Sequence, residues 1–288
     1  MAALPSRTLL VTLLGAFARR TDDWMPISGI VALLAELGAD ESSVRTSVSR
    51  LKKRRWLEAE KRQGRSGYRL TDVAKDALAA GDRVIWHARQ PANLEDGWCI
   101  ASFSVPEKDR ARRHLLRSRL AALGFGNVGQ GVWIAPARMR KDALQLIDAL
   151  ELRDYTNVFT GRHEGGQDLT TMIQSSWDLD DIDARYRAFV AEHTRDLEGF
   201  PQQIDHSAVG PRDAFVRYML AVDDWRMLPL RDPGLPRELL RSDWAGDEAV
   251  RLLASIVDGL DEEYIAVCLS GRGDKDLAEV LAALEASS

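Results

Sequence analysis

The sequence contains few cysteines. Only Cys99 and Cys268 occur among the 288 residues, and they are far apart, without a Cys-x-x-Cys pair. Two cysteines cannot build a zinc site by themselves, and this usage is typical of a protein kept in a reducing compartment.

Long hydrophobic runs are also missing. The stretch from Leu9 to Phe17 is apolar but short, and Thr12 and Gly15 interrupt it. One arginine precedes it and no small-residue cleavage site follows, so a core helix explains it better than a signal peptide. No run has the length of a membrane span, and we expect a cytoplasmic protein without a membrane partner.

Motifs of enzymes are scarce. There is no Walker loop and no Gly-x-Ser-x-Gly elbow. Gly124-x-Gly126-x-x-Gly129 matches the dinucleotide fingerprint as a string, but it follows a predicted helix and leads into a predicted strand, the reverse of what phosphate binding requires. The five histidines form no cluster with metal-ligand spacing. We therefore expect no cofactor, no metal site and no enzymatic activity.

Charge is distributed unevenly along the chain. Residues 1–90 hold 16 Lys and Arg against 10 Asp and Glu, whereas the remainder holds 23 against 34. A basic head on an acidic body indicates a nucleic-acid partner at one end. It also argues against a membrane-surface protein, because anionic lipid would repel the body.

The stretch from Asp40 to Leu70 is central to the prediction. Its first half predicts a helix that Asp40 caps, with one narrow apolar stripe formed by Val44, Val48 and Leu51. The other faces carry short hydroxyls and long cations, the side chains that reach base edges and phosphates from a helix in the major groove.

The second half of this stretch predicts a two-stranded ribbon. Leu57 and Ala59 alternate with charged residues before a turn at residues 64–67, and Tyr68 and Leu70 alternate after it. Residues 41–69 contain ten Lys and Arg against three Glu. A helix followed by a basic hairpin predicts a winged helix-turn-helix that binds DNA. A solvated basic helix beside a surface hairpin, or a head that binds an acidic protein, is the alternative.

We expect the DNA contacts to come from this helix and hairpin. The predicted residues are Ser42, Ser43, Arg45, Thr46, Ser49, Arg50, Lys52, Lys53, Arg65, Ser66 and Arg69.

The remaining pattern predicts a multidomain α+β protein. Helices are expected at 6–20 and 27–37 before the central stretch, and at 71–88 after it, where Val73, Ala77, Val84 and Ile85 would face inward. Residues 91–172 alternate strand, helix, strand, helix and strand, which favours a small ferredoxin-like domain. Residues 173–288 are expected to be mostly helical, with helices at 178–193, 211–222, 247–260 and 274–286. The predicted domains are therefore 1–90, 91–172 and 173–288.

Three stretches of the chain resemble the PaaX family of bacterial repressors. The head from Val44 to Thr71 is similar to its DNA-binding domain, and Val105-Pro106-Glu107 with Gly131-Val132-Trp133-Ile134 is similar to its Cas2-like domain. Trp177-Asp178-Leu179 and the segment from Asp232 to Leu240 resemble its C-terminal domain. The resemblance covers nearly the whole chain in the same order.

The resemblance implies a homodimeric repressor of an aromatic-acid catabolic operon. Such a repressor binds an operator with inverted half-sites and leaves it when an aryl-acyl-coenzyme A thioester, typically phenylacetyl-CoA, binds. A pocket for that ligand needs aromatic walls and cations for the phosphates. The candidates are Trp133, Trp177, Arg217, Trp225 and Arg226; Trp244 is a further aromatic residue of this kind, and core packing is the alternative role for each tryptophan.

Two positions depart from the family pattern. Ser104 stands where the family, and Cas2 nucleases more so, tend to have an aspartate, so a metal-dependent nuclease is the enzyme alternative that this position disfavours. Asp223 and Asp224 stand where a His-Glu pair is usual, which puts the inherited effector identity in question.

Overall fold

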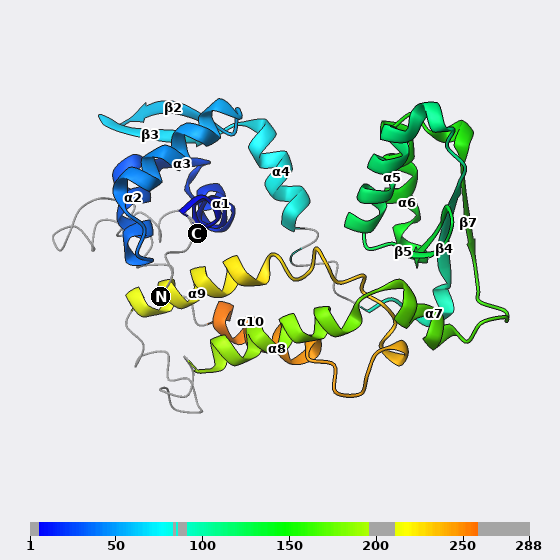
Figure 1. The fold of residues 1–288 in the computed structure, drawn as a ribbon. Helices are drawn as coiled ribbons and strands as arrows, with labels where there is room; N and C mark the ends of the chain where they lie inside the picture. Colours follow the sequence, from blue (N-terminus) through cyan, green and yellow to red (C-terminus); the bar gives the residue numbers. More distant parts are fainter. Residues whose placement is uncertain (1–5, 83–84, 86–90, 196–210, 259–288) are drawn as a thin grey trace. The chain divides into compact units, whose positions relative to one another are not determined.

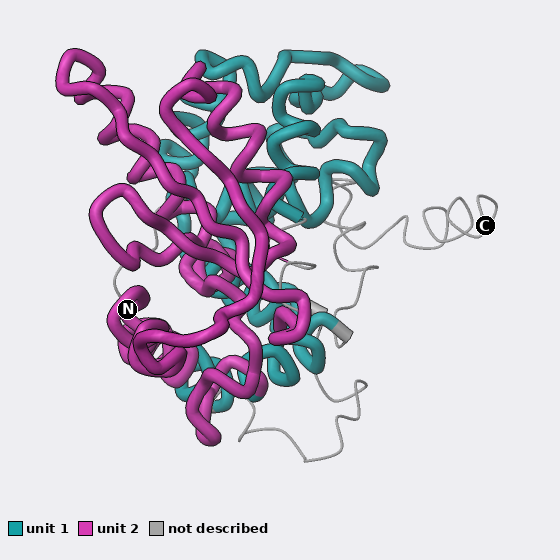
Figure 2. Tube along the Cα trace, turned by 90° about the vertical axis from the view of Figure 1, so that its right-hand side faces the viewer, with its two compact units in different colours: residues 1–82, 189–225, 248–288 teal, residues 83–188, 226–247 magenta. Residues whose placement is uncertain are grey.

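The computed structural model describes residues 6–82, 85, 91–195 and 211–258 (Figure 1). They form two compact units, shown in different colours in Figure 2. Unit 1 contains residues 1–82, 189–225 and 248–288, and unit 2 contains residues 83–188 and 226–247. The predicted helix at 274–286, and Val84, His87, His206 and Cys268, lie outside the described residues.

The first part of unit 1 holds the four helices α1 to α4 and a small sheet. Helices α1 (Ser6–Phe17), α2 (Ile27–Glu36) and α3 (Glu41–Lys53) are followed by strands β2 (Leu57–Arg62) and β3 (Arg65–Leu70) and helix α4 (Asp72–Asp82). A short strand β1 (Trp24–Pro26) adds to the sheet, whose order is β1-β3-β2 with antiparallel pairs. The sequence did not predict β1, because three residues ending in proline carry no strand periodicity.

The turn of the β2–β3 hairpin lies earlier than predicted. Arg62 pairs with Arg65, so Gln63 and Gly64 form a two-residue loop, and both have positive φ values of 49° and 78°. This is the conformation of the hairpin turns whose twist matches that of the strands. Arg65 and Ser66 therefore lie on strand β3 and not in the turn.

Helix α9 (Pro211–Trp225) completes the core of this unit. The rings of Phe215 and Tyr218 lie 6.1 and 5.6 Å from the ring of Phe17 on α1. The buried Thr12 hydroxyl donates a 2.6 Å hydrogen bond to the Asp223 carboxylate. This hydrogen bond joins residues 211 positions apart in the sequence and connects helix α1 of the head to helix α9.

Unit 2 is built on a four-stranded antiparallel sheet. The element order is β4 (Trp98–Phe103), α5 (Arg110–Ala122), β5 (Gly126–Gly129), β6 (Val132–Pro136), α6 (Arg140–Ala149) and β7 (Thr156–Gly161). The strand order across the sheet is β5-β6-β4-β7. The glycine-rich string that resembles a dinucleotide fingerprint follows helix α5, as the sequence predicts, but its residues Gly126–Gly129 form strand β5, which the sequence did not predict.

Both faces of this sheet are covered. Helices α5 and α6 bury one face over Cys99, Ala101 and Trp133, with Leu116 and Ile147 from the helices. The other face packs Trp98 and Ile134 against helix α7 (Leu169–Ser176) and Leu235. A sheet covered on both sides explains why β4 and β6 are apolar at nearly every position instead of alternating.

The C-terminal segment is shared between the units. Helix α8 (Leu179–Arg195) begins in unit 2 and its residues from Phe189 onward belong to unit 1, as does helix α10 (Gly246–Asp258) from Glu248 onward. The proline-rich segment 229–236 contains neither helix nor strand, as predicted. The compact units thus group residues differently from three consecutive sequence segments.

Some inward-facing predictions are wrong. Val73 is 57% exposed and Ala77 is exposed, whereas Ala74 and Leu78 point into the core. The Thr71 hydroxyl accepts from the Ala74 N–H and sets where the first turn begins, so the buried stripe is shifted by one residue. None of the described helices combines the length and the apolar character that crossing a bilayer requires.

Candidate nucleic-acid interface

Helix α3 begins at a well-formed cap. Asp40 accepts hydrogen bonds from the Ser42 hydroxyl (2.6 Å) and the Ser43 N–H (2.9 Å). The bond from the Ser42 hydroxyl, and then that from the Ser43 N–H, holds the pKa of Asp40 below its ordinary value. The negative charge thus stabilises the positive end of the helix, as the sequence predicts.

One face of α3 is buried and the others are open to solvent. Val44, Val48 and Leu51 are 3% exposed or less, and Ser47 joins them. Most of the predicted DNA-binding residues on this helix are exposed: Ser42, Arg45, Thr46, Ser49, Arg50, Lys52 and Lys53. Ser43 is half-buried. The arrangement presents hydroxyls and cations together on the outer surface of one helix.

The cations of the head differ in their ionic partners. Arg45 pairs with Glu41 (2.6 Å), and Arg69 pairs with Glu58 (2.7 Å) and Glu60 (3.2 Å). Within the described ranges, no carboxylate lies at ion-pair distance from Arg50, Lys52 or Lys53. Among the predicted DNA contacts, the cations of the last turn of α3 are therefore the least neutralised by carboxylates, and Arg69 is the most neutralised.

The hairpin lies against the end of α3. The Lys52 ammonium lies 5.7 Å from the centre of the Tyr68 ring on β3, a cation–π contact. Ser66 is exposed on the same strand and Arg65 is half-buried. This contact joins the last turn of α3 to the hairpin and positions the Lys52 side chain.

The proposed effector residues are divided between the two units. Trp133 is 7% exposed in the core beneath α5 and α6, and Trp225 is 1% exposed in unit 1, where its ring lies 5.4 Å from that of Phe189. Arg217 lies half-buried on α9, and Arg226 is half-buried just after that helix. Core packing, the alternative role for each tryptophan, accounts for Trp133 and Trp225.

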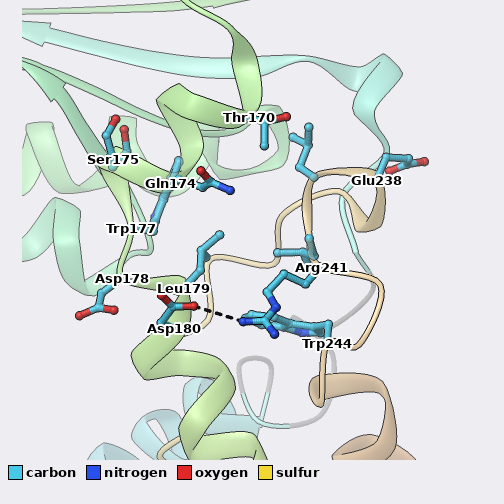
Figure 3. Close-up of a pocket in the computed structure, with 13 residues that line it drawn as sticks. Thr170, Gln174, Ser175, Trp177, Asp178, Leu179, Asp180, Glu238, Arg241 and Trp244 are labelled. Carbon is cyan, nitrogen blue, oxygen red and sulfur yellow. Dashed lines mark ion pairs between the residues drawn. The ribbon is translucent and has the colours of Figure 1, made fainter.

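Trp177 lines an open cleft in unit 2 (Figure 3). The cleft has a volume of about 770 Å³, and its walls come from α7, the turn into α8 and the segment 238–244. Apolar and aromatic walls are provided by Trp177, Leu179, Leu239, Leu240 and Trp244. The Trp177 indole N–H donates to the Gly124 carbonyl (3.0 Å), which fixes the ring in the wall.

The charged groups of the cleft are mostly acidic. Asp178, Asp180 and Glu238 line it together with one cation, Arg241. Arg241 lies 3.6 Å from Asp180 and binds Asp243, and its hydrogen bond is the main cause that lowers the pKa of Asp243. The sequence pointed to Trp177 and Trp244, but its only signal for Leu239 and Leu240 was their place in a family motif, and it carried none for Arg241.

Other reactive groups have structural surroundings. Cys99 is buried in the sheet, and burial raises the pKa of its thiol to about 11, so it stays protonated at neutral pH. Ser104 is exposed and its N–H donates to the Tyr155 carbonyl (2.9 Å). In the described part of the chain, no three side chains of His, Cys, Asp or Glu come together as a metal site would require.

The two aspartates at the departure from the family pattern have separate partners. Asp223 is buried and accepts from Thr12, whereas Asp224 is half-exposed and lies 3.1 Å from the buried His193 ring. Both contacts lie within unit 1, where they join α9 to α1 and to α8.

Three family descriptions match successive parts of the chain. Residues 5–74 match "PaaX-like protein", residues 91–173 match "PaaX protein central Cas2-like domain", and residues 177–264 match "PaaX-like protein C-terminal domain".

Two individual proteins are similar over most of the chain. The transcriptional repressor PaaX of Escherichia coli (strain K12) is 26% identical over 257 residues, which cover 88% of this chain and 79% of that protein. The structure of the uncharacterized protein Rv0674 from Mycobacterium tuberculosis is similar with a TM-score of 0.59 at 19% identity, covering 94% of this chain and 99% of that one. The second likeness concerns the fold alone.

Proposed function

The chain belongs to the PaaX family, and we propose that it is a DNA-binding transcriptional repressor that acts in the cytoplasm. One observation carries the proposal: the outer face of α3 combines exposed hydroxyls with Arg50, Lys52 and Lys53, whose charges no described carboxylate neutralises. Phosphates attract such cations without sequence preference, while hydroxyls and arginines can read base edges.

The proposal assigns a role to each segment. Residues 1–90 act as a winged helix-turn-helix, with α3 in the major groove and the β2–β3 hairpin against the adjacent minor groove. Residues 91–172 act as a ferredoxin-like domain and residues 173–288 as a helical domain that together receive the signal. Two copies in a homodimer need inverted half-sites about one helical turn, or a multiple of it, apart.

The DNA contacts divide by chemistry. Arg45, Thr46, Ser49 and Arg50 contact bases or phosphates, with Ser42 and Ser43 at the start of the helix. Lys52, Lys53, Arg65 and Ser66 contact the backbone. Arg69 contributes least among the predicted residues, because two glutamates already neutralise it.

The salt dependence of DNA binding tests this proposal. Each phosphate contact releases counterions, so the affinity of the full chain for duplex DNA should fall steeply with salt. Lys52→Ala with Lys53→Ala should reduce the slope of log K against log salt by about one unit per lost contact. Fluorescence anisotropy on an operator selected from random duplexes measures both quantities. An unchanged slope would remove the two lysines from the interface, and no binding at low salt would reject the function.

The effector is proposed to be an aryl-acyl-coenzyme A thioester such as phenylacetyl-CoA, made in an aromatic-acid catabolic pathway whose operon the protein represses. The volume of the cleft in unit 2 is within the usual range of small-molecule sites, and its aromatic walls suit an aryl group. Its acidic lining does not suit phosphates, so the coenzyme would extend out of the cleft. Release requires that the ligand bind the DNA-incompetent arrangement better than the competent one.

Titration of the protein–DNA complex tests the ligand. Phenylacetyl-CoA should release DNA, whereas phenylacetate and coenzyme A separately should not. Gln174→Trp should abolish release by filling the cleft, and the exposed Thr171→Trp on the same helix outside the lining is the matched control. Release by a different acyl-CoA alone would overturn the ligand and leave the mechanism in place.

A further inference from the structure

In the part of the chain that the structure describes, no strand pairs with the outer edge of β7 in the four-stranded sheet. Strand β7 is the last strand in the order β5-β6-β4-β7 and forms the margin of the sheet (Figure 1). Its six residues, Thr-Asn-Val-Phe-Thr-Gly, carry no charge, and Phe159 is 58% exposed. Natural proteins usually block such an edge with charges, proline, bulges or a short strand, because unpaired backbone groups recruit another strand.

The opposite edge of the sheet, strand β5, has features that prevent another strand from pairing with it. Strand β5 has four residues, and its register shifts between Asn127 and Gly129. A Cβ at Gly126 would meet the Trp177 ring at 2.7 Å, so α7 lies directly against that strand. Strand β7 has neither the bulge nor the short length.

The hydrogen-bond pattern shows which backbone groups β7 presents. The Ser104 N–H donates to the Tyr155 carbonyl, so that pair is hydrogen-bonded, and antiparallel pairs alternate between bonded and non-bonded. With the register Phe103 to Thr156, the backbone groups of Asn157, Phe159 and Gly161 face β4. Those of Val158 and Thr160 face outward, whereas the Thr156 N–H donates to the Arg153 carbonyl.

We propose that β7 pairs with β7 of a second copy of this chain, antiparallel and centred on Val158, so that two sheets join into one of eight strands. In an antiparallel pair, residues directly opposite each other project their side chains to the same face of the sheet. A two-fold axis normal to the joined sheet therefore requires that one residue of β7 lie opposite the same residue of the partner subunit. Val158 is the central residue whose backbone groups face outward. In this register Asn157 lies opposite Phe159 of the partner subunit.

Charge complementarity favours this register. Continued past the strand ends, it brings Asp154, in the short helix before β7, near Arg162 of the partner subunit, which would share its charge between Asp154 and the Glu95 of its own chain. Centring on Phe159 would instead bring Asp154 opposite Glu164 of the partner subunit, and like charges in opposing positions are destabilising. This inference rests on the homodimer of the proposed function, for which the β7 pairing supplies the interface. Because the pairing is tested without DNA, the pairing and the DNA-binding function can each fail independently.

Paired charge variants of the full chain test the register. Asn157 and Phe159 are both exposed, so changing them leaves the core intact. In the double variant Asn157→Lys with Phe159→Lys, each new lysine lies opposite a lysine of the partner subunit. Repulsion should then prevent pairing and give the mass of a single chain, and Asn157→Glu with Phe159→Glu should do the same. A one-to-one mixture of the two variants should recover the dimer mass. Ser118→Lys with Ala122→Lys, both exposed on α5, is the charge-matched control that should stay dimeric.

Sedimentation equilibrium gives the masses, and circular dichroism checks that each variant is folded. A wild-type chain of single mass at every concentration would overturn the proposal and assign the edge to a different partner. A lysine variant that remains dimeric, or a mixture that does not associate, would overturn it as well. Hydrogen exchange adds a backbone readout: the Val158 and Thr160 amides should gain protection as concentration rises, while the Phe159 amide is protected throughout.

Discussion

Helices α3 and α5 both carry several basic residues, and they differ in what these cations contact. On α3 the cations of the last turn lie on the outer surface beside serine and threonine hydroxyls. On α5, Arg112 donates to the Leu150 and Glu151 carbonyls at the end of α6, and Arg113 donates to the Val105 carbonyl and to Glu107. Two helices of similar basic composition therefore use their cations differently: α3 exposes them on its surface, whereas α5 uses two of them to bind neighbouring backbone.

The difference shows why a count of basic residues is a weak guide to nucleic-acid binding. Carbonyls at the end of a helix have no partner within the helix, and a guanidinium satisfies them while opposing the negative end of the dipole. Arg112 provides this for α6, so part of the charge on α5 stabilises the fold. Arg117 and Arg119 on the same helix remain exposed, which makes α5 a suitable control for α3.

The largest expected effect comes from reversing charge on each helix. Arg50→Glu with Lys53→Glu should weaken binding to operator DNA by about 100-fold at moderate salt, because two phosphate contacts are lost and two repulsions are added. Arg117→Glu with Arg119→Glu changes the net charge equally and should weaken binding by only a few-fold, through the long-range field. Fluorescence anisotropy measures both. Equal losses would show that binding follows net charge rather than the α3 surface.

A second comparison concerns one glycine in each sheet. A Cβ at Gly67 on β3 would lie 2.5 Å from the Met25 carbonyl oxygen and 2.6 Å from the Trp24 ring, whereas a Cβ at Gly129 on β5 would meet no atom within 4 Å. Gly67→Ala should lower the free energy of unfolding by about 2 kcal/mol, since backbone must move. Gly129→Ala should leave it nearly unchanged. Chemical denaturation of both variants tests this, and equal stability of the two would mean that β1 does not hold its place against β3.

The smallest expected effect is on stability, and it distinguishes a cation that supports the fold, Arg112, from a cation on the surface, Lys53. Arg112→Met keeps the apolar stem but removes the bonds to the end of α6, and should cost about 1 kcal/mol of unfolding free energy because the side chain is partly exposed. Lys53→Met, at an exposed position of α3, should leave stability unchanged and reduce DNA affinity. A loss of stability in Lys53→Met alone would reverse the roles assigned to the two helices.

Patterns of short range predicted much of the fold. The cap at Asp40, the stripe of Val44, Val48 and Leu51, and the two strands of a hairpin after this helix are present as the sequence predicted. Strands β1 and β5 and helix α7 were missed, because short segments with glycine, proline or weak periodicity form through pairing and packing with distant residues. The hairpin turn was misplaced because its position depends on strand register.

The sequence by itself determined which residues could form a basic head and that this head differs from the acidic remainder, because charge and periodicity are properties of neighbouring residues. Only the tertiary structure decided which cations stay available. Glu58 and Glu60 neutralise Arg69 across a hairpin, α6 occupies Arg112, and Trp133 and Trp225 are enclosed in cores. Partners of this kind are brought together by folding over long sequence separations, and no local pattern encodes them.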